Sequence, residues 1–177
     1  MTIIAFGASS KSASINKQLA SYTASLLENA EIEVLDLNDF ELPLFSEDKE
    51  KELGSPELAA KFFAKLGDSD GIIISFAEHN GSYSAAYKNL FDWCSRIDQK
   101  VFQNKPMVLL STSPGPGGAG NVLRLATESA PHFAGDVKAT LSVPKFYDNF
   151  DMESGAITNA ELRDQLSAAV QELTSPA

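Results

Sequence analysis

Short apolar runs alternate with longer stretches of helical periodicity along the chain. Each run has the length of a strand and is rich in Ile, Val and Leu, as expected for strands buried on both faces of a parallel sheet. The runs are Thr2–Phe6, Glu33–Leu37, Gly71–Ser75, Pro106–Ser111 and Val137–Val143. The alternation predicts repeated strand–helix–strand units and therefore an α/β fold.

Apolar residues between these runs recur at intervals of three and four positions, which places them on one face of a helix. The groups are Ile15, Leu19, Tyr22 and Leu26; Leu58, Phe62 and Leu66; and Leu162, Leu166, Ala169 and Leu173. Two more helices are expected, from about Ser84 to Arg96 and from about Asn121 to Phe133. Five parallel strands with helices on both faces fit the flavodoxin-like doubly wound sheet of order 2-1-3-4-5. We expect residues 1–177 to form a single domain of this type.

Ligands of such folds bind beyond the carboxyl ends of the strands, where the strand order reverses. The relevant loops are Gly7–Ser14, Phe76–Ser82 and Ser113–Gly120. The first contains four serines and Lys11, and it leads into a helix whose free amides can bind an anion. It matches neither the Walker nor the dinucleotide-binding glycine pattern. The composition predicts a phosphate-binding loop, although Ser12 or Ser14 acting only as a helix cap explains it equally well.

Together with segments further along the chain, this loop resembles the NADPH-dependent FMN reductase family, which includes quinone, azo-dye and chromate reductases. The family's first loop, GSxRxxSxN, is matched by Ser9, Lys11, Ser14 and Asn16. Its central motif, PEYNGSxPxxLKNxxDW, is matched by Glu78, Asn80, Gly81, Ser82, Lys88, Asn89, Asp92 and Trp93. The segment Ser113–Gly118 is similar to its SxGxxGG turn, and Pro144-Lys145-Phe146 with Asn149-Phe150 is similar to its segment after the fifth strand.

The resemblance implies an FMN-dependent oxidoreductase that passes electrons from NAD(P)H to a quinone, a flavin or another small acceptor. The first loop would hold the FMN phosphate, and the other two loops would line the isoalloxazine ring. The implied cofactor-binding residues are Ser9, Lys11, Ser14, Ile15, Asn16, Glu78, His79, Asn80, Gly81, Ser82, Ser113, Gly115, Gly117 and Gly118. No side chain need be catalytic, because the cofactor supplies the chemistry. With two histidines far apart, we expect no metal site.

The chain departs from the family pattern at three positions. Lys11 stands where the family has arginine, which keeps the charge but loses the planar two-pronged donor. Ala77 replaces a proline and His79 replaces a tyrosine. These departures predict weaker FMN binding or an altered choice of acceptor, and they keep open a flavin-binding protein without activity.

Composition narrows the class of protein further. The 24 acidic and 14 basic residues give a net charge of −10, which disfavours nucleic acid and anionic membranes as partners. The single cysteine, Cys94, allows no intramolecular disulfide and no multi-cysteine metal site, and its apolar neighbours predict a buried side chain. Because the sequence begins without a leader peptide and holds no run long enough to span a membrane, we expect a cytoplasmic protein without membrane insertion.

Two features suggest contacts beyond the core. The helix near residues 84–96 carries Ala86, Trp93 and Ile97 outside its main apolar stripe, and an exposed tryptophan there would favour a homodimer or a dimer of dimers. The loop with Phe40, Pro43, Leu44 and Phe45 either packs locally or forms a wall of the substrate site.

The main alternative function is a non-enzymatic electron carrier of flavodoxin type, which the acidic charge would suit. The chain lacks the TGxT phosphate loop common in flavodoxins. A receiver-type signalling domain has the same strand order but needs acidic residues after the first strand, and Gly7-Ala8-Ser9 provides none.

Overall fold

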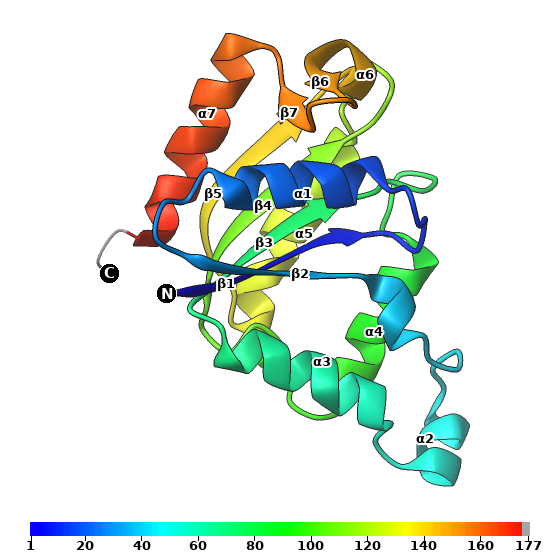
Figure 1. Cartoon of the computed structure of the whole chain (residues 1–177). Helices are drawn as coiled ribbons and strands as arrows, with labels where there is room; N and C mark the ends of the chain where they lie inside the picture. Colours follow the sequence, from blue (N-terminus) through cyan, green and yellow to red (C-terminus); the bar gives the residue numbers. More distant parts are fainter. Residues whose placement is uncertain (175–177) are drawn as a thin grey trace.

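The computed structural model describes residues 1–174 and has a central parallel sheet of five strands in the order β2-β1-β3-β4-β5 (Figure 1). The strands are β1 (Thr2–Ala8), β2 (Glu31–Leu35), β3 (Gly71–Phe76), β4 (Pro106–Thr112) and β5 (Asp136–Val143). All of their pairings are parallel. The flavodoxin-like α/β fold and its strand order, expected from the sequence, are confirmed.

Burial differs between the centre and the edges of the sheet. Every residue of β3 is buried, and so are nearly all of those in β1 and β4. The edge strands β2 and β5 are largely half-exposed, so the expectation that all five strands are buried on both faces is wrong for these two. The second strand also begins and ends two residues earlier than expected, because the Asp36 carboxylate accepts a hydrogen bond from the Asn38 amide and starts a 3₁₀ turn, η1 (Leu37–Phe40).

Helices cover both faces of the sheet (Figure 1). Helices α1 (Ile15–Ser25) and α7 (Ala160–Gln171) pack on one face, and α3 (Glu57–Asp68), α4 (Ala85–Ser95) and α5 (Gly120–Ser129) pack on the other. These helices confirm the expected ones. Pro131, which has no amide hydrogen, lies where α5 ends and the 3₁₀ turn η2 (Ala130–Phe133) begins. The helix expected from about Asn121 to Phe133 is therefore divided into these two elements.

The sequence pattern did not predict the smaller elements. Helix α2 (Glu47–Leu53) buries no residue, so no apolar periodicity marks it. Helix α6 (Phe146–Asn149) and the hairpin of β6 (Phe150–Asp151) with β7 (Ala156–Ile157) are too short for a periodic signal. Of these elements, α6 contributes Tyr147 to the site described below.

The loop that follows η1 packs against α4. The Trp93 indole donates a hydrogen bond to the Pro43 carbonyl oxygen at 2.7 Å and meets the Phe45 ring edge-on. Asn89 accepts from the Phe45 amide and donates to the Pro43 carbonyl oxygen. Local packing therefore explains most of this apolar loop. The expectation of an exposed tryptophan is wrong, because Trp93 is only 1% exposed, whereas Leu44 at the tip of the loop is 81% exposed.

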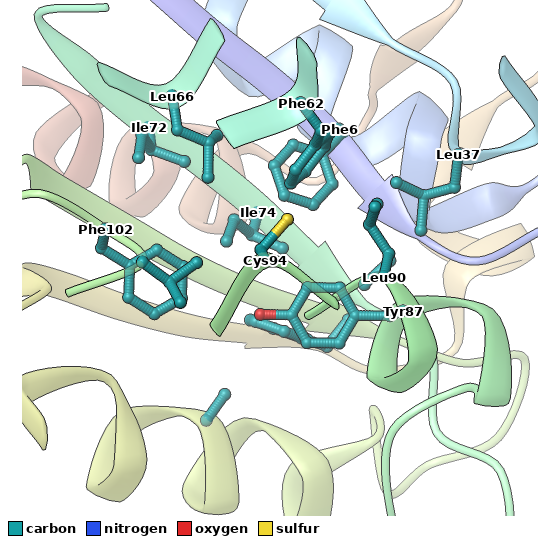
Figure 2. Close-up of a cluster of buried hydrophobic side chains, with 14 of the residues drawn as sticks. Phe6, Leu37, Phe62, Leu66, Ile72, Ile74, Tyr87, Leu90, Cys94 and Phe102 are labelled. Carbon is teal, nitrogen blue, oxygen red and sulfur yellow. The ribbon is translucent and has the colours of Figure 1, made fainter. Parts of the chain in front are cut away.

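Cys94 lies in the hydrophobic core among the buried side chains of Figure 2, as expected from its neighbours. Its side chain is completely buried. Burial raises the pKa of the Cys94 thiol to about 12 because the apolar surroundings disfavour the thiolate. The thiolate is the reactive form of cysteine, so this thiol is held in its unreactive form.

We therefore expect Cys94 in the folded protein to resist alkylation by iodoacetamide at about pH 8, where a free thiol with an ordinary pKa reacts readily. Urea-unfolded protein should be alkylated completely over the same interval. Mass spectrometry of the intact chain measures both outcomes, with Cys94→Ser as the unlabelled control. Rapid labelling of the folded chain would contradict the buried position.

Candidate functional site

Three loops meet in a hollow at the carboxyl ends of β1, β3 and β4, where the strand order reverses. The hollow has a volume of about 390 Å³. Its lining residues are Ser9, Ser10, Lys11, Ser14, Ile15, Asn16, Ala77, Glu78, His79, Thr112, Ser113, Pro114 and Tyr147. The structure thus brings together the three segments that the sequence singled out, in the place where doubly wound sheets bind ligands.

Asn16 fixes the first loop over the other two strands. Its side-chain oxygen accepts hydrogen bonds from the Ser75 hydroxyl at 2.7 Å and from the Thr112 amide at 3.2 Å. Its side-chain nitrogen donates to the Thr112 carbonyl oxygen at 3.4 Å. Asn16 is 4% exposed and its side-chain amide serves this buried network, and the residue also lines the hollow.

The first loop combines hydroxyl groups with a lysine, Lys11. The Ser14 side chain accepts from the Lys17 amide and caps α1, so the capping role considered from the sequence is present. Ser9 accepts from the Lys11 amide in the same way. The N–H groups of Ile15 and Asn16, in the first turn of α1, have no partner among the described residues.

The two lysines near this loop differ in their surroundings. The Lys17 ammonium pairs with Asp36 at 2.6 Å, and this hydrogen bond is the largest cause of the lowered pKa of the Asp36 carboxyl. Lys11 is exposed and forms no ion pair within residues 1–174. Lys11 is therefore the cation that the hollow offers to an anionic ligand.

The second loop is a tight hairpin. The amides and carbonyls of His79 and Ser82 bond to each other in an antiparallel bridge, at 2.9 and 3.2 Å. Between them Asn80 and Gly81 both have positive φ, of 53° and 79°, which is the preferred geometry of an Asn-Gly hairpin turn. His79 lines the hollow, whereas Asn80, Gly81 and Ser82 are not among its lining residues.

Glu78 connects the second loop to the start of α5. Its carboxylate accepts from the Val122 amide at 2.9 Å and from the Asn121 side chain at 3.3 Å. A carboxylate at this position satisfies an amide at the start of the helix and interacts favourably with the helix dipole. The sequence predicted Glu78 to contact the cofactor, but the contacts present also give it a positioning role that spacing alone did not reveal.

The third loop is held by main-chain bonds. The Ser113 carbonyl oxygen accepts from the Phe146 amide at 3.0 Å, and the Gly115 carbonyl oxygen accepts from the Lys145 amide at 2.9 Å. Gly118 has a φ of 57°, and a β-carbon there would collide with Ser142. Ser113 lines the hollow, whereas Gly115, Gly117 and Gly118 are not among its lining residues.

Tyr147 is a lining residue that the sequence analysis missed. It lies on α6, is 54% exposed, and meets the ring of Phe146 edge-on at 5.4 Å between centroids. Tyr147 directly follows Pro144-Lys145-Phe146, which is similar to the family's segment after the fifth strand. An aromatic residue at that position is the sequence signal that points to a site residue. An exposed aromatic ring beside a hollow of this kind can stack on a planar ligand.

No group of three or more His, Cys, Asp or Glu side chains within residues 1–174 could hold a metal ion. None of the described helices is long and apolar enough to cross a membrane.

Two curated relatives from different kingdoms are similar to this chain. A 2-hydroxy-1,4-benzoquinone reductase from a Burkholderia species is 37% identical over 107 residues, which cover 59% of this chain and 56% of that protein. An NADPH:quinone oxidoreductase from Arabidopsis thaliana is 30% identical over 138 residues, covering 76% of this chain and 69% of that protein. The similarity thus extends over only a little more than half of the first relative.

Among solved structures, the flavoenzyme NAD(P)H:(acceptor) oxidoreductase FerB from Paracoccus denitrificans has the same fold, with a TM-score of 0.80 and 22% identity. The two structures match over 97% of this chain and 94% of that one. A family match that spans residues 1–148, with the description NADPH-dependent FMN reductase, includes all three loops of the hollow. The chain therefore belongs to the NADPH-dependent FMN reductase family of oxidoreductases.

Proposed function

We propose that the protein is an FMN-dependent NAD(P)H oxidoreductase that reduces a quinone, a flavin or another small acceptor, and that the chain acts as one FMN-binding domain. The observation that carries this proposal is the hollow itself, which unites the three family loops around Lys11, a lysine without an ion pair among residues 1–174. Quinones are the acceptors named for both curated relatives, which supports a quinone as the first acceptor to test.

The size and the donors of the hollow fit FMN. Its volume of about 390 Å³ falls within the usual range of ligand sites, roughly 300–1,000 Å³. A phosphate group needs a cation and several hydrogen-bond donors, and Lys11, the serine hydroxyls and the first amides of α1 provide them. We therefore assign the phosphate to the loop Gly7–Ser14, with Ser9, Lys11, Ser14, Ile15 and Asn16 around it.

The opposite part of the hollow suits the flavin ring. When bound, FMN accepts a hydride from the nicotinamide nucleotide and returns electrons to the acceptor. Main-chain groups of Ala77, His79 and Ser113 can lie against the ring edge, and the exposed Tyr147 can cover it. Glu78 keeps the hairpin and the start of α5 at a fixed separation, and Asn80, Gly81 and Ser82 shape the rim that an acceptor passes.

The departures from the family pattern act at the edge of this site. His79 is exposed and lines the hollow, so it presents an imidazole to the ring or the acceptor where relatives of the family type present a phenol. Ala77 leaves the backbone before it less restricted than a proline would. We propose that these residues tune acceptor preference while the main-chain bonds preserve the shape of the loop.

Purified protein should show a flavin absorption spectrum and should oxidise NADH or NADPH continuously when 1,4-benzoquinone is supplied. The reason is that a flavin bound in the hollow can meet both small substrates in turn. Absorbance of the nicotinamide measures the rate. A flavodoxin-type electron carrier would instead bind the flavin and show no sustained NAD(P)H oxidation with any small acceptor, which is the result that would favour the alternative function.

Replacing Lys11 by alanine should weaken FMN binding by about 10- to 150-fold, because a charge-assisted hydrogen bond contributes about 1.5–3 kcal/mol. A flavin-fluorescence titration measures the affinity. Riboflavin has the same ring without the phosphate, so its weaker binding should hardly change. Raised salt should weaken binding of FMN more than that of riboflavin, because ions screen the attraction to the exposed lysine.

The matched control for this titration is Lys17→Ala, which removes the paired lysine near the same loop. It should weaken FMN binding less than Lys11→Ala does. Equal losses of FMN and riboflavin in Lys11→Ala would point to a disturbed ring site. No loss of either ligand would place the phosphate elsewhere and contradict the assignment of the first loop.

We also propose that the protein is a cytoplasmic homodimer. The single buried cysteine suits a reducing compartment. The family resemblance implies the dimer, whereas Trp93 is buried within the chain and is not available to an interface. The exposed Leu44, which shares a surface depression with Ala85 and Ala86 on α4, is a suitable centre for the interface.

Sedimentation at micromolar concentration should therefore give a dimer, and Leu44→Glu should shift it towards monomer because the interface would bury a charge. Met152→Glu, at another exposed apolar side chain, should leave the dimer intact. A wild-type monomer at this concentration would contradict the proposed assembly without affecting the proposed reaction.

A further inference from the structure

A groove of about 500 Å³ lies between α1 and the hairpin of β6 and β7 (Figure 1). One wall is the end of the first loop together with α1, from Ser12 to Ser25, and the other includes Phe150 and Met152 of the hairpin segment. Ser14 lines both this groove and the hollow, so the two meet at the first loop. A ligand whose phosphate lies at that loop can therefore extend from the hollow into the groove.

Gln18 contributes an unsatisfied polar atom to the groove wall. Its side-chain oxygen Oε1 is buried and accepts no hydrogen bond, and it is the only such buried side-chain atom among residues 1–174. A buried acceptor without a donor is unfavourable, and a donor on a ligand would relieve it. The last side-chain bond of a glutamine rotates easily, so the Gln18 amide can turn its oxygen towards a ligand in the groove.

The groups around Gln18 suit a purine base. The amide carries a donor beside its acceptor, and adenine presents an amino group beside a ring nitrogen that accepts, so the two can form a pair of hydrogen bonds. Further along the groove, the rings of Tyr22 and Phe150 meet edge-on at 6.2 Å between centroids. Met152 is 52% exposed. These three side chains give a planar base an apolar surface.

The groove also contains a cation close to the hollow. Lys17 lines the groove one turn of α1 after Ser14, and its ammonium pairs with Asp36 at 2.6 Å. Both side chains of this pair are partly exposed. Because an ammonium has three donors, Lys17 can bind a phosphate oxygen and keep its contact with Asp36. A second phosphate, joined to the one assigned to the first loop, would lie within reach of this ammonium.

We propose that this groove binds the adenosine monophosphate half of FAD, while the flavin half lies in the hollow as FMN does. The inference rests on the proposed function, because it takes the flavin and its first phosphate in the positions assigned there. The second phosphate lies beside Lys17 and the adenine beside Gln18. The volume of the groove falls within the usual range of ligand sites, roughly 300–1,000 Å³. The protein therefore accepts FAD as well as FMN.

The two flavins differ only in the adenosine monophosphate half, so together they test the assignment. Isothermal titration calorimetry of the full chain freed of flavin should show FAD binding about tenfold more tightly than FMN, because the adenine adds hydrogen bonds and a ring contact. Gln18→Leu removes the amide and should weaken FAD binding by about two- to tenfold without changing FMN binding. Gln165→Leu, the same substitution at an exposed position of α7, is the matched control and should change neither affinity.

A second readout distinguishes binding from a structural role of Gln18. Because its Oε1 atom has no partner, Gln18→Leu should not lower the Tm of the flavin-free chain. Blocking the groove gives an independent arm. Ser21→Trp, on the α1 wall, should reduce the affinity for FAD to that for FMN. Ser25→Trp, at the exposed end of the same wall, serves if the first variant fails to fold.

The opposite results overturn the inference. If the wild type binds FAD no more tightly than FMN, or if FAD keeps its advantage in both blocked variants, the adenosine half does not lie in the groove. Equal losses of FMN and FAD in Gln18→Leu, with a lowered Tm, would show that Gln18 is structural. Each of these results leaves FMN binding and NAD(P)H oxidation by the wild type intact, whereas a wild type that binds neither flavin contradicts the proposed function itself.

Discussion

The buried amide of Asn16 is the interaction on which the arrangement of the site depends. It joins the first turn of α1 to Ser75 at the end of β3 and to Thr112 at the end of β4. Gly7 makes this junction possible, because a β-carbon there would lie 2.8 Å from the Lys17 Cα, closer than real side chains approach. The loop between Gly7 and Asn16 is therefore fixed at both ends over the middle of the sheet. Its serines and Lys11 then face the two neighbouring loops.

Main-chain hydrogen bonds hold the tip of the second loop, and this explains how a side chain can vary there. The hairpin depends on the positive φ values of Asn80 and Gly81 and on the bridge between His79 and Ser82, none of which requires a particular side chain at position 79. The loop at Ser113 is likewise tied to the segment before α6 through amides and carbonyls. A histidine in place of a tyrosine can therefore change the chemistry of the rim without changing its shape.

The sequence was sufficient for the sheet, its strand order and the three loops, because buried parallel strands and an Asn-Gly turn leave strong local patterns. What it could not provide depends on contacts between distant segments. The Glu78 carboxylate meets an amide 44 residues away, and Tyr147 reaches the hollow from a four-residue helix. Trp93 looked exposed because its helix has two apolar stripes, and the loop at Pro43, 50 residues earlier, covers the second one. No periodicity within a helix can reveal a cover of that kind.

The hydrogen bonds from Asn89 and Trp93 also determine what kind of contact Leu44 can make. A long exposed loop normally samples many conformations, and ordering it on association costs conformational entropy. Here the backbone on both sides of Leu44 is bonded to α4, so its side chain is presented by an already ordered segment. Association through Leu44 would proceed between preorganised surfaces, and its affinity would depend on shape and desolvation more than on the ordering of the chain.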